Sequence, residues 1–186
     1  LRQIVMNPYL PPEDGLESVY RYVQFYEEPV TNETALQINR LCMSDPFFIF
    51  CVINSPYEKK DLTTEEGVIG TVNYEITDKF SEMSITWGEY IELSLRRIND
   101  IHAKNILLHL SKNADREWTP KEIRDALGLD LEPNEIHKRL RVMVSADLIR
   151  EGSSDIDYGG LTDGTLCTIL RSRFEEEIST FAPDLK

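Results

Sequence analysis

The feature that most constrains this chain is the order of helix and turn signals between residues 101 and 160. Apolar residues at helical spacing predict a helix over 101–110. Residues 119–122 then read Thr-Pro-Lys-Glu, which supplies an N-cap hydroxyl, a proline at the first helical position and an acid in the first turn. The short helix that begins there is predicted to end at Gly128. A longer helix follows, with an inner face made of Ile136, Leu140, Met143 and Val144.

A hairpin signal follows these helices. Residues 147–151 and 156–158 favour short strands, and the Gly-Ser-Ser-Asp sequence at 152–155 favours a turn between them. Helix, short helix, longer helix and hairpin is the order of a winged helix-turn-helix domain. We therefore expect such a domain over residues 99–160.

The rest of the chain shows helix signals and little strand signal. Prolines and N-cap residues divide 1–98 into four or five helices, and the apolar run 47–54 is expected at the centre of their core. Residues 63–66, Thr-Thr-Glu-Glu, look like a capping box for one of these helices. A trailing helix and a linker to a further domain are expected over 161–186. The predicted fold class is mainly α, a helical bundle followed by a winged helix-turn-helix domain with a small β-hairpin.

Hydropathy, the cysteines and the net charge indicate in which compartment the chain lies and what it can bind. No apolar run approaches the roughly 20 residues of a membrane-spanning helix, so no membrane contact is expected. The cysteines Cys42, Cys51 and Cys167 show no paired spacing and are expected to be reduced, which favours the cytoplasm; no metal site is predicted. The net charge is −13, and residues 99–160 carry 9 basic and 12 acidic side chains. Because such a surface repels phosphate, any DNA binding is expected to be weak.

The sequence lacks motifs for catalysis. It has no G-x-x-x-x-G-K-[ST] loop and no Gly-Lys pair, so no catalytic residue is assigned and this chain is not expected to be an enzyme. Lys138, Arg141 and Ser145 lie about one turn apart, opposite the apolar face of the longer helix. They are candidate contacts for DNA or for a protein partner, and the same pattern is typical of a solvated helix face.

Several short motifs occur in an order that is found in one family. They are Asp-Pro-Phe-Phe-Ile at 45–49, Trp-Gly-Glu-Tyr-Ile at 87–91 ahead of Asn99, Thr-Pro-Lys-Glu-Ile at 119–123, Asp-Leu-Ile at 147–149 and Tyr-Gly-Gly-Leu-Thr-Asp at 158–163. Over nearly the whole chain, this order resembles the C-terminal half of archaeal-type P-loop ATPases, AAA-related proteins of the STAND group. In that family a helical lid follows the ATPase core and a winged helix follows the lid. Ser44 stands where the lid usually has glycine.

The resemblance implies that the chain is a piece of a longer protein, as its first residue, Leu1, also suggests. A missing N-terminal P-loop ATPase domain would hold ATP and magnesium, with no cofactor bound by this chain alone, and a nuclease-like domain follows in many members. Ser44, Asp45, Pro46 and Phe47 would sense the nucleotide, with Pro46 near the base. A helix that begins at Pro46 also offers a positive dipole end and free N–H groups, and Phe47 with Phe48 would line a slot for a flat ring.

The sequence therefore predicts a non-catalytic transmitter portion of a STAND-type ATPase, which couples the nucleotide state to a winged-helix interaction module. The alternative is a stand-alone transcription regulator that binds DNA through the winged helix and uses the helical part as a sensor or dimeriser.

Overall fold

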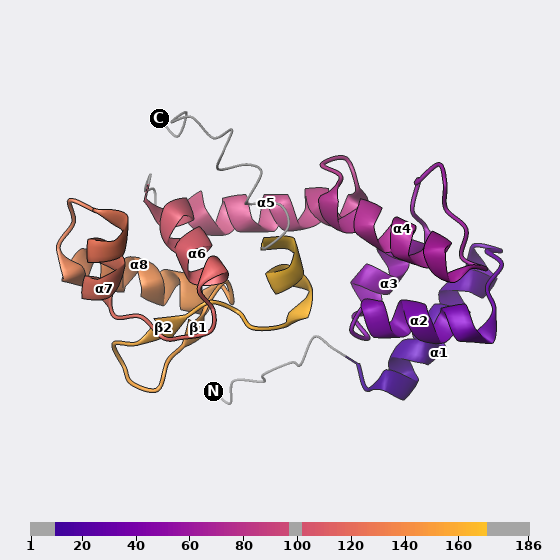
Figure 1. Ribbon diagram of the computed structural model, residues 1–186, viewed down its shortest axis with the longest axis horizontal. Helices are drawn as coiled ribbons and strands as arrows, with labels where there is room; N and C mark the ends of the chain where they lie inside the picture. The colour runs from indigo at the N-terminus through magenta and orange to yellow at the C-terminus, as the bar shows by residue number, and fades with distance from the viewer. Residues whose placement is uncertain (1–9, 97–101, 171–186) are drawn as a thin grey trace. The chain divides into compact units, whose positions relative to one another are not determined.

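The computed structural model describes residues 10–96 and 102–170 (Figure 1). These residues are mainly helical with one two-stranded antiparallel hairpin, which confirms the prediction of a mainly α chain. By the contacts between its residues, the chain divides into two compact units, Leu1–Ile85 (unit 1) and Thr86–Lys186 (unit 2). The division falls inside α5 (Glu82–Arg96). The boundary expected at residue 98 lies outside the described residues and stays a prediction.

Unit 1 is built from helices around one central helix. It contains α1 (Pro12–Phe25), α2 (Asn32–Leu41), α3 (Pro46–Ile53), α4 (Glu65–Thr77) and the start of α5. Both α1 and α4 pack against α2 and α3. Four side chains of α3 have no exposed surface, namely Phe48, Ile49, Val52 and Ile53. The prediction that the apolar run 47–54 lies at the centre of the core is confirmed.

Local side chains fix where the helices of unit 1 begin. Thr31 and Thr34 form a reciprocal capping box at α2. Thr64 caps α4, and its hydroxyl accepts the Gly67 N–H at 3.2 Å. The capping box expected over 63–66 was wrong, because the residue three positions after the cap is Gly67, which has no side chain to return the bond.

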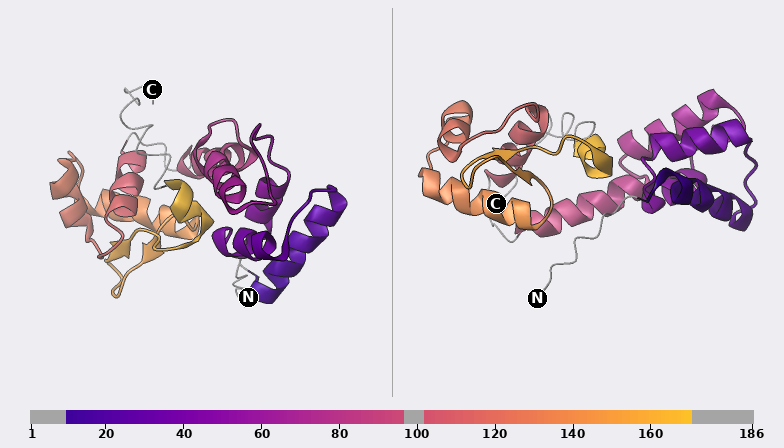
Figure 2. Two further views of the ribbon diagram at one scale, coloured as in Figure 1. Left: turned by 45° about the vertical axis from the view of Figure 1, so that its right-hand side comes forward. Right: turned by 90° about the horizontal axis from the view of Figure 1, so that it is seen from below.

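Unit 2 contains α6 (Ala103–Lys112), α7 (Pro120–Leu127), α8 (Pro133–Ser145), β1 (Arg150–Glu151) and β2 (Tyr158–Gly159). The strands pair antiparallel, with Arg150 opposite Gly159 and Glu151 opposite Tyr158. On its other side, β2 bridges to Trp118, which lies just before α7. Figure 2 shows the hairpin next to α8.

The strands are shorter than the sequence suggested. Residues 147–149 are not a strand, because Asp147 has a φ of +54° and the Leu148 N–H bonds to Met143 O at 3.0 Å, which closes the end of α8. The return strand is Tyr158–Gly159 rather than 156–158. The predicted start and end of α7 are confirmed, since Thr119 and Glu122 form its capping box and Gly128 ends it at a φ of +60°.

One apolar cluster holds unit 2 together. It joins α6, α7, α8 and the hairpin, and its fully buried members include Ile106, Leu110, Ile123, Ile136, Leu140 and Met143. The predicted inner face of α8 is thus confirmed at its three buried positions, while Val144 is partly buried. Residues 164–170 are helical. The rest of the expected trailing helix and the linker lie outside the described residues.

Candidate functional site

The turn between α2 and α3 has an unusual backbone. Met43 and Ser44 each have a φ of +55°, the left-handed region that favours glycine. Their N–H groups bond back to Arg40 O at 3.2 Å and Asn39 O at 3.1 Å, so the end of α2 has the hydrogen bonds of a Schellman motif. Ser44 extends the left-handed conformation by one residue beyond the position that this motif requires.

Asp45 and Pro46 start α3. Proline occupies the first turn, as predicted, and Asp45 Oδ1 accepts the N–H groups of Phe47 at 2.9 Å and Phe48 at 3.3 Å. The expectation that these N–H groups are free was therefore wrong, because the helix supplies its own anionic cap. Phe48 is fully buried and does not line a surface slot, which corrects a second expectation.

The N-terminal part of α1 covers this turn. Ser44 and Asp45 are only 6% and 7% exposed. The approach is close because α1 presents a glycine: a Cβ added at Gly15 would lie 2.6 Å from Ser44 Cβ. Leu10 N–H also donates to Ser44 O at 3.1 Å. Of the four predicted sensing residues, Pro46 and Phe47 are therefore the two that reach the surface.

Phe47 belongs to an aromatic cluster that the sequence analysis missed. Its ring stacks on Phe50 with centroids 6.4 Å apart, and Phe50 contacts Tyr22 at 5.9 Å and Tyr26 at 6.1 Å. All four rings are partly exposed, and the neighbouring Phe25 is 76% exposed. The helices α1 and α3 thus share an aromatic surface with Phe47 at one end. The i, i+4 spacing of the tyrosines and the i, i+3 spacing of the phenylalanines were the available signals.

The second predicted site lies on α8. Lys138, Arg141 and Ser145 are all exposed, on the side of the helix away from the buried face. The hydroxyl of Ser145 donates to Val142 O at 2.9 Å within its own helix. These three side chains form one polar face, as predicted; what the face contacts stays a prediction.

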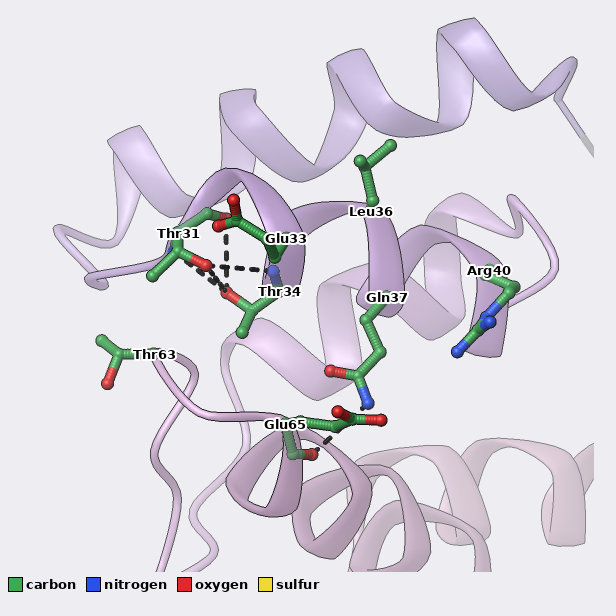
Figure 3. A pocket seen from close by; sticks show the side chains of 8 residues that line it. All are labelled: Thr31, Glu33, Thr34, Leu36, Gln37, Arg40, Thr63 and Glu65. Atoms are coloured by element: carbon green, nitrogen blue, oxygen red, sulfur yellow. Dashed lines mark hydrogen bonds between the residues drawn. The ribbon is translucent and has the colours of Figure 1, made fainter.

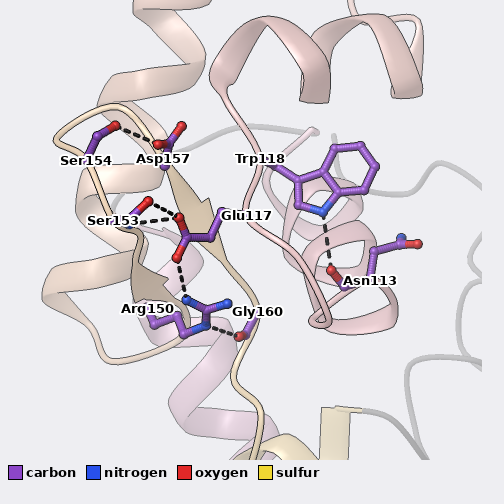
Figure 4. Close-up of polar contacts among 8 residues, drawn as sticks. All are labelled: Asn113, Glu117, Trp118, Arg150, Ser153, Ser154, Asp157 and Gly160. Carbon is purple, nitrogen blue, oxygen red and sulfur yellow. Dashed lines mark hydrogen bonds and ion pairs between the residues drawn. The ribbon is translucent and has the colours of Figure 1, made fainter.

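A polar network fixes the hairpin next to this helix (Figure 4). Glu117 Oε1 pairs with Arg150 Nη1 at 3.1 Å, and Glu117 Oε2 accepts the N–H and the hydroxyl of Ser153 at 2.8 and 2.6 Å. The hydroxyl and N–H of Ser153, followed by Arg150, hold the pKa of Glu117 below its usual range. Arg150 Nε also donates to Gly160 O at 3.2 Å. Both groups that the Arg150 guanidinium contacts therefore lie within unit 2, where they stabilise the hairpin.

The tip of the hairpin is acidic. Residues 151–157 contain Glu151, Asp155 and Asp157 and no lysine or arginine. The apolar Ile156 is 57% exposed in the same loop. Such a tip repels a phosphate backbone and is compatible with a neutral or basic protein surface.

Unit 1 buries a carboxyl group and two thiols that can titrate. Glu75 has no exposed surface, and burial raises its pKa. Burial also raises the pKa of the Cys42 and Cys51 thiols, which opposes formation of a reactive thiolate. Within 10–96 and 102–170, no three histidine, cysteine or acidic side chains group so as to hold a metal ion. In the same residues, no helix combines the length and apolarity needed to cross a membrane.

Comparison with known protein families, curated proteins and solved structures finds no match for this chain.

Proposed function

We propose that this chain is the non-catalytic transmitter portion of an ATP-binding STAND-type ATPase, with unit 1 as the helical lid and unit 2 as a winged helix-turn-helix domain. The observation that carries the proposal is the pairing of Trp118 with β2. Trp118 N–H donates to Tyr158 O at 2.8 Å and Tyr158 N–H donates to Trp118 O at 3.0 Å. This pairing places a short extended segment between α6 and α7.

The element order then supports a winged helix. A helix, the bridged residue Trp118, two further helices and a two-stranded hairpin follow one another, and this order is similar to that of winged helix-turn-helix domains. A hydrogen bond between the Tyr158 hydroxyl and His137 Nδ1 at 3.0 Å ties the hairpin to α8, the helix in the recognition position. The outer face of α8, with Lys138, Arg141 and Ser145, is the proposed contact surface.

The α2–α3 turn supports the lid assignment. Pro46 begins a helix there, and Phe47 exposes an aromatic ring beside it. In the intact protein, the missing P-loop domain holds ATP and magnesium, and Pro46 and Phe47 pack near the base. Ser44 and Asp45 set the conformation of the turn, because one has a left-handed backbone and the other caps α3.

The helix α5 is the proposed transmitter, because it has anchors in both units. Near its start, the hydroxyls of Ser81 and Ser84 donate to the backbone oxygen of Glu75 at 2.7 and 3.2 Å. Further along, the Tyr90 hydroxyl donates to Ala146 O at 2.6 Å. A change of lid conformation that moves α5 would therefore act on the C-terminal end of α8.

In this proposal, unit 2 binds a protein partner. The intact protein is a cytoplasmic ATPase, and a nuclease-like domain follows unit 2. The charges favour a protein partner, because the acidic hairpin tip offsets Lys138 and Arg141.

The test uses the intact parent protein. Pro46→Ala is expected to weaken nucleotide binding several-fold without changing the circular dichroism spectrum, and Pro29→Ala, in the exposed α1–α2 loop, is the matched control. Unchanged affinity in Pro46→Ala, or an equal loss in the control, contradicts the proposal. A reading frame without an upstream P-loop contradicts it as well.

A second candidate is a DNA-binding regulator, which the exposed Lys138 and Arg141 on α8 favour. The isolated chain is expected to bind duplex DNA only weakly, without sequence preference, and less as salt rises. Tight, selective binding at physiological salt that is lost in the Lys138→Ala, Arg141→Ala double variant would favour the regulator.

A further inference from the structure

The helix α2 carries two buried carboxamides, and they face different neighbours. Gln37 Nε2 donates to Glu65 O at the start of α4 at 3.4 Å (Figure 3). Asn39 is 6% exposed, and its Nδ2 donates to Pro12 O in the first turn of α1 at 2.7 Å. Because a backbone oxygen can only accept, this bond fixes which end of the Asn39 carboxamide carries the nitrogen and which the oxygen.

The Asn39 carboxamide oxygen is buried and, within the described residues, has no hydrogen-bond partner. It lies against Gly15 of α1, since a Cβ added at Gly15 would lie 2.3 Å from Asn39 Oδ1. A buried acceptor without a donor opposes the packing that buries it. If the first turn of α1 moved away, water would supply the missing hydrogen bond. The closed arrangement therefore carries a penalty that an open one lacks.

The part of α1 that covers this oxygen buries little of its own surface. Residues 11–14 are all exposed, and Gly15 is buried but has no side chain. The helix begins at Pro12, and no side chain of the described residues caps it. The first large apolar side chain that α1 fully buries is Val19, one turn further on. Opening of the segment before Val19 thus exposes little apolar surface and costs less than unfolding of unit 1.

The same segment closes the α2–α3 turn. Leu10 N–H donates to Ser44 O at 3.1 Å, and the bond from Asn39 to Pro12 O lies in the next turn of the chain. A Cβ added at Gly15 would also lie 2.7 Å from Ser44 Oγ. Two hydrogen bonds and one close glycine contact therefore hold the segment over Ser44, and the unpartnered oxygen of Asn39 opposes them.

We infer that residues 10–15 form a latch, which opens locally and gives access to Asn39 and Ser44 while the rest of unit 1 stays folded. The consequence for nucleotide binding rests on the proposed function: Ser44 and Asp45, which are covered when the latch is closed, become reachable from the missing P-loop domain when it opens. The latch itself does not depend on that function, so its test uses this chain alone.

Access to the covered turn can be measured with a thiol at position 44. The Ser44→Cys variant reacts with methyl methanethiosulfonate, and tandem mass spectrometry follows each cysteine separately. The native Cys51 is 1% exposed in α3 and serves as the internal standard, because its reaction reports unfolding of unit 1. We expect the introduced thiol to react at least tenfold faster than Cys51.

A second substitution in α1 tests whether the latch controls this access. Gly15→Ala in the Ser44→Cys chain is expected to speed reaction at position 44 several-fold, because its Cβ meets Asn39 Oδ1, and to leave Cys51 unchanged. Gln24→Ala, at an exposed position of the same helix, is the matched control and is expected to change neither rate.

Hydrogen exchange gives the same comparison in the native chain, without the introduced thiol. The Ser44 amide donates to Asn39 O at 3.1 Å under the latch, and its exchange is expected to be independent of low urea concentrations. Exchange of the Ile53 amide, in the core, is expected to rise with urea. The inference is overturned if the introduced thiol and Cys51 react at the same rate, if Gly15→Ala accelerates both equally, or if both amides follow one urea dependence.

Discussion

Ser44 is a serine in a backbone conformation that favours glycine, and this makes its contribution to stability testable. Its φ is +55°, and within residues 10–96 and 102–170 its hydroxyl makes no hydrogen bond that would stabilise the turn. We expect Ser44→Gly to raise the free energy of unfolding by about 1 kcal/mol, because a Cβ in the left-handed region costs about that much. Ser44→Ala is the control, since it removes the hydroxyl and keeps the Cβ. If urea unfolding shows the same increase in the free energy of unfolding for both variants, the backbone at Ser44 is not strained by its Cβ.

Glu75 is a buried carboxyl group with a raised pKa and a predictable effect of pH. Burial is the main cause, with smaller contributions from Glu82 and Asp78, while the Ser55 hydroxyl and the Met83 N–H oppose the rise. The protonated form therefore stabilises the folded state below the unfolded pKa of about 4.3, and this stabilisation is lost as the pH rises through the raised pKa of the folded protein.

The measurement compares Glu75→Gln with the native chain by urea unfolding between about pH 4 and pH 8. Because glutamine stays neutral, the variant is expected to lose less stability as the pH rises. Glu66→Gln, on the exposed side of the same helix, is expected to keep the native pH profile. A Glu75→Gln profile parallel to the native one would exclude Glu75 as the source.

Close packing of elements in unit 2 depends on one glycine after β2. A Cβ added at Gly160 would lie 2.1 Å from the backbone oxygen of Leu110 in α6, whereas one added at Gly128 would meet nothing within 4 Å. Gly160→Ala is therefore expected to destabilise by more than about 2 kcal/mol, and Gly128→Ala by about 1 kcal/mol from its positive φ alone. The measurement compares the melting temperatures of the two variants. A smaller fall for Gly160→Ala than for Gly128→Ala would show that the segment after β2 can move away from α6 at little cost.

Helix limits could be predicted from the sequence where the deciding contacts are local. Thr119, Glu122 and Gly128 act within a few residues of one another, so the start and end of α7 follow from the sequence. The hairpin depends on contacts with distant residues. Trp118 pairs with Tyr158, 40 positions later, and Glu117 holds Arg150 and Ser153, so strand length and register could not be derived from the 147–158 segment alone.

The candidate sites also differ in whether they depend on local contacts or on contacts between distant residues. The shared face of Lys138 and Arg141 follows from helical periodicity. The aromatic surface needs α1 beside α3, and this pairing of helices is not visible in the spacing of apolar residues. The cap at Asp45 could have been expected, because aspartate before a proline-led helix is a strong N-cap signal.

At the scale of the whole chain, each unit has its own buried core. Phe48 and its neighbours fill unit 1, and the cluster around Leu140 fills unit 2. Units with separate cores unfold separately unless a shared element couples them, and here α5 belongs to both. The degree of coupling can be measured because both tryptophans, Trp87 and Trp118, lie in unit 2.

Tryptophan fluorescence therefore reports the unfolding of unit 2, while far-ultraviolet circular dichroism reports the helices of both units. We expect Phe48→Ala, a loss of about 3–5 kcal/mol in the core of unit 1, to lower the melting temperature of part of the dichroism signal and to leave the fluorescence transition within a few degrees of the native one. Leu140→Ala, in the core of unit 2, is expected to lower the melting temperature seen by fluorescence and to leave the part of the dichroism signal that comes from unit 1 unchanged. If Phe48→Ala instead shifts both signals equally, the two cores unfold as one unit. The helix α5 would then carry the stability of one unit to the other even without nucleotide.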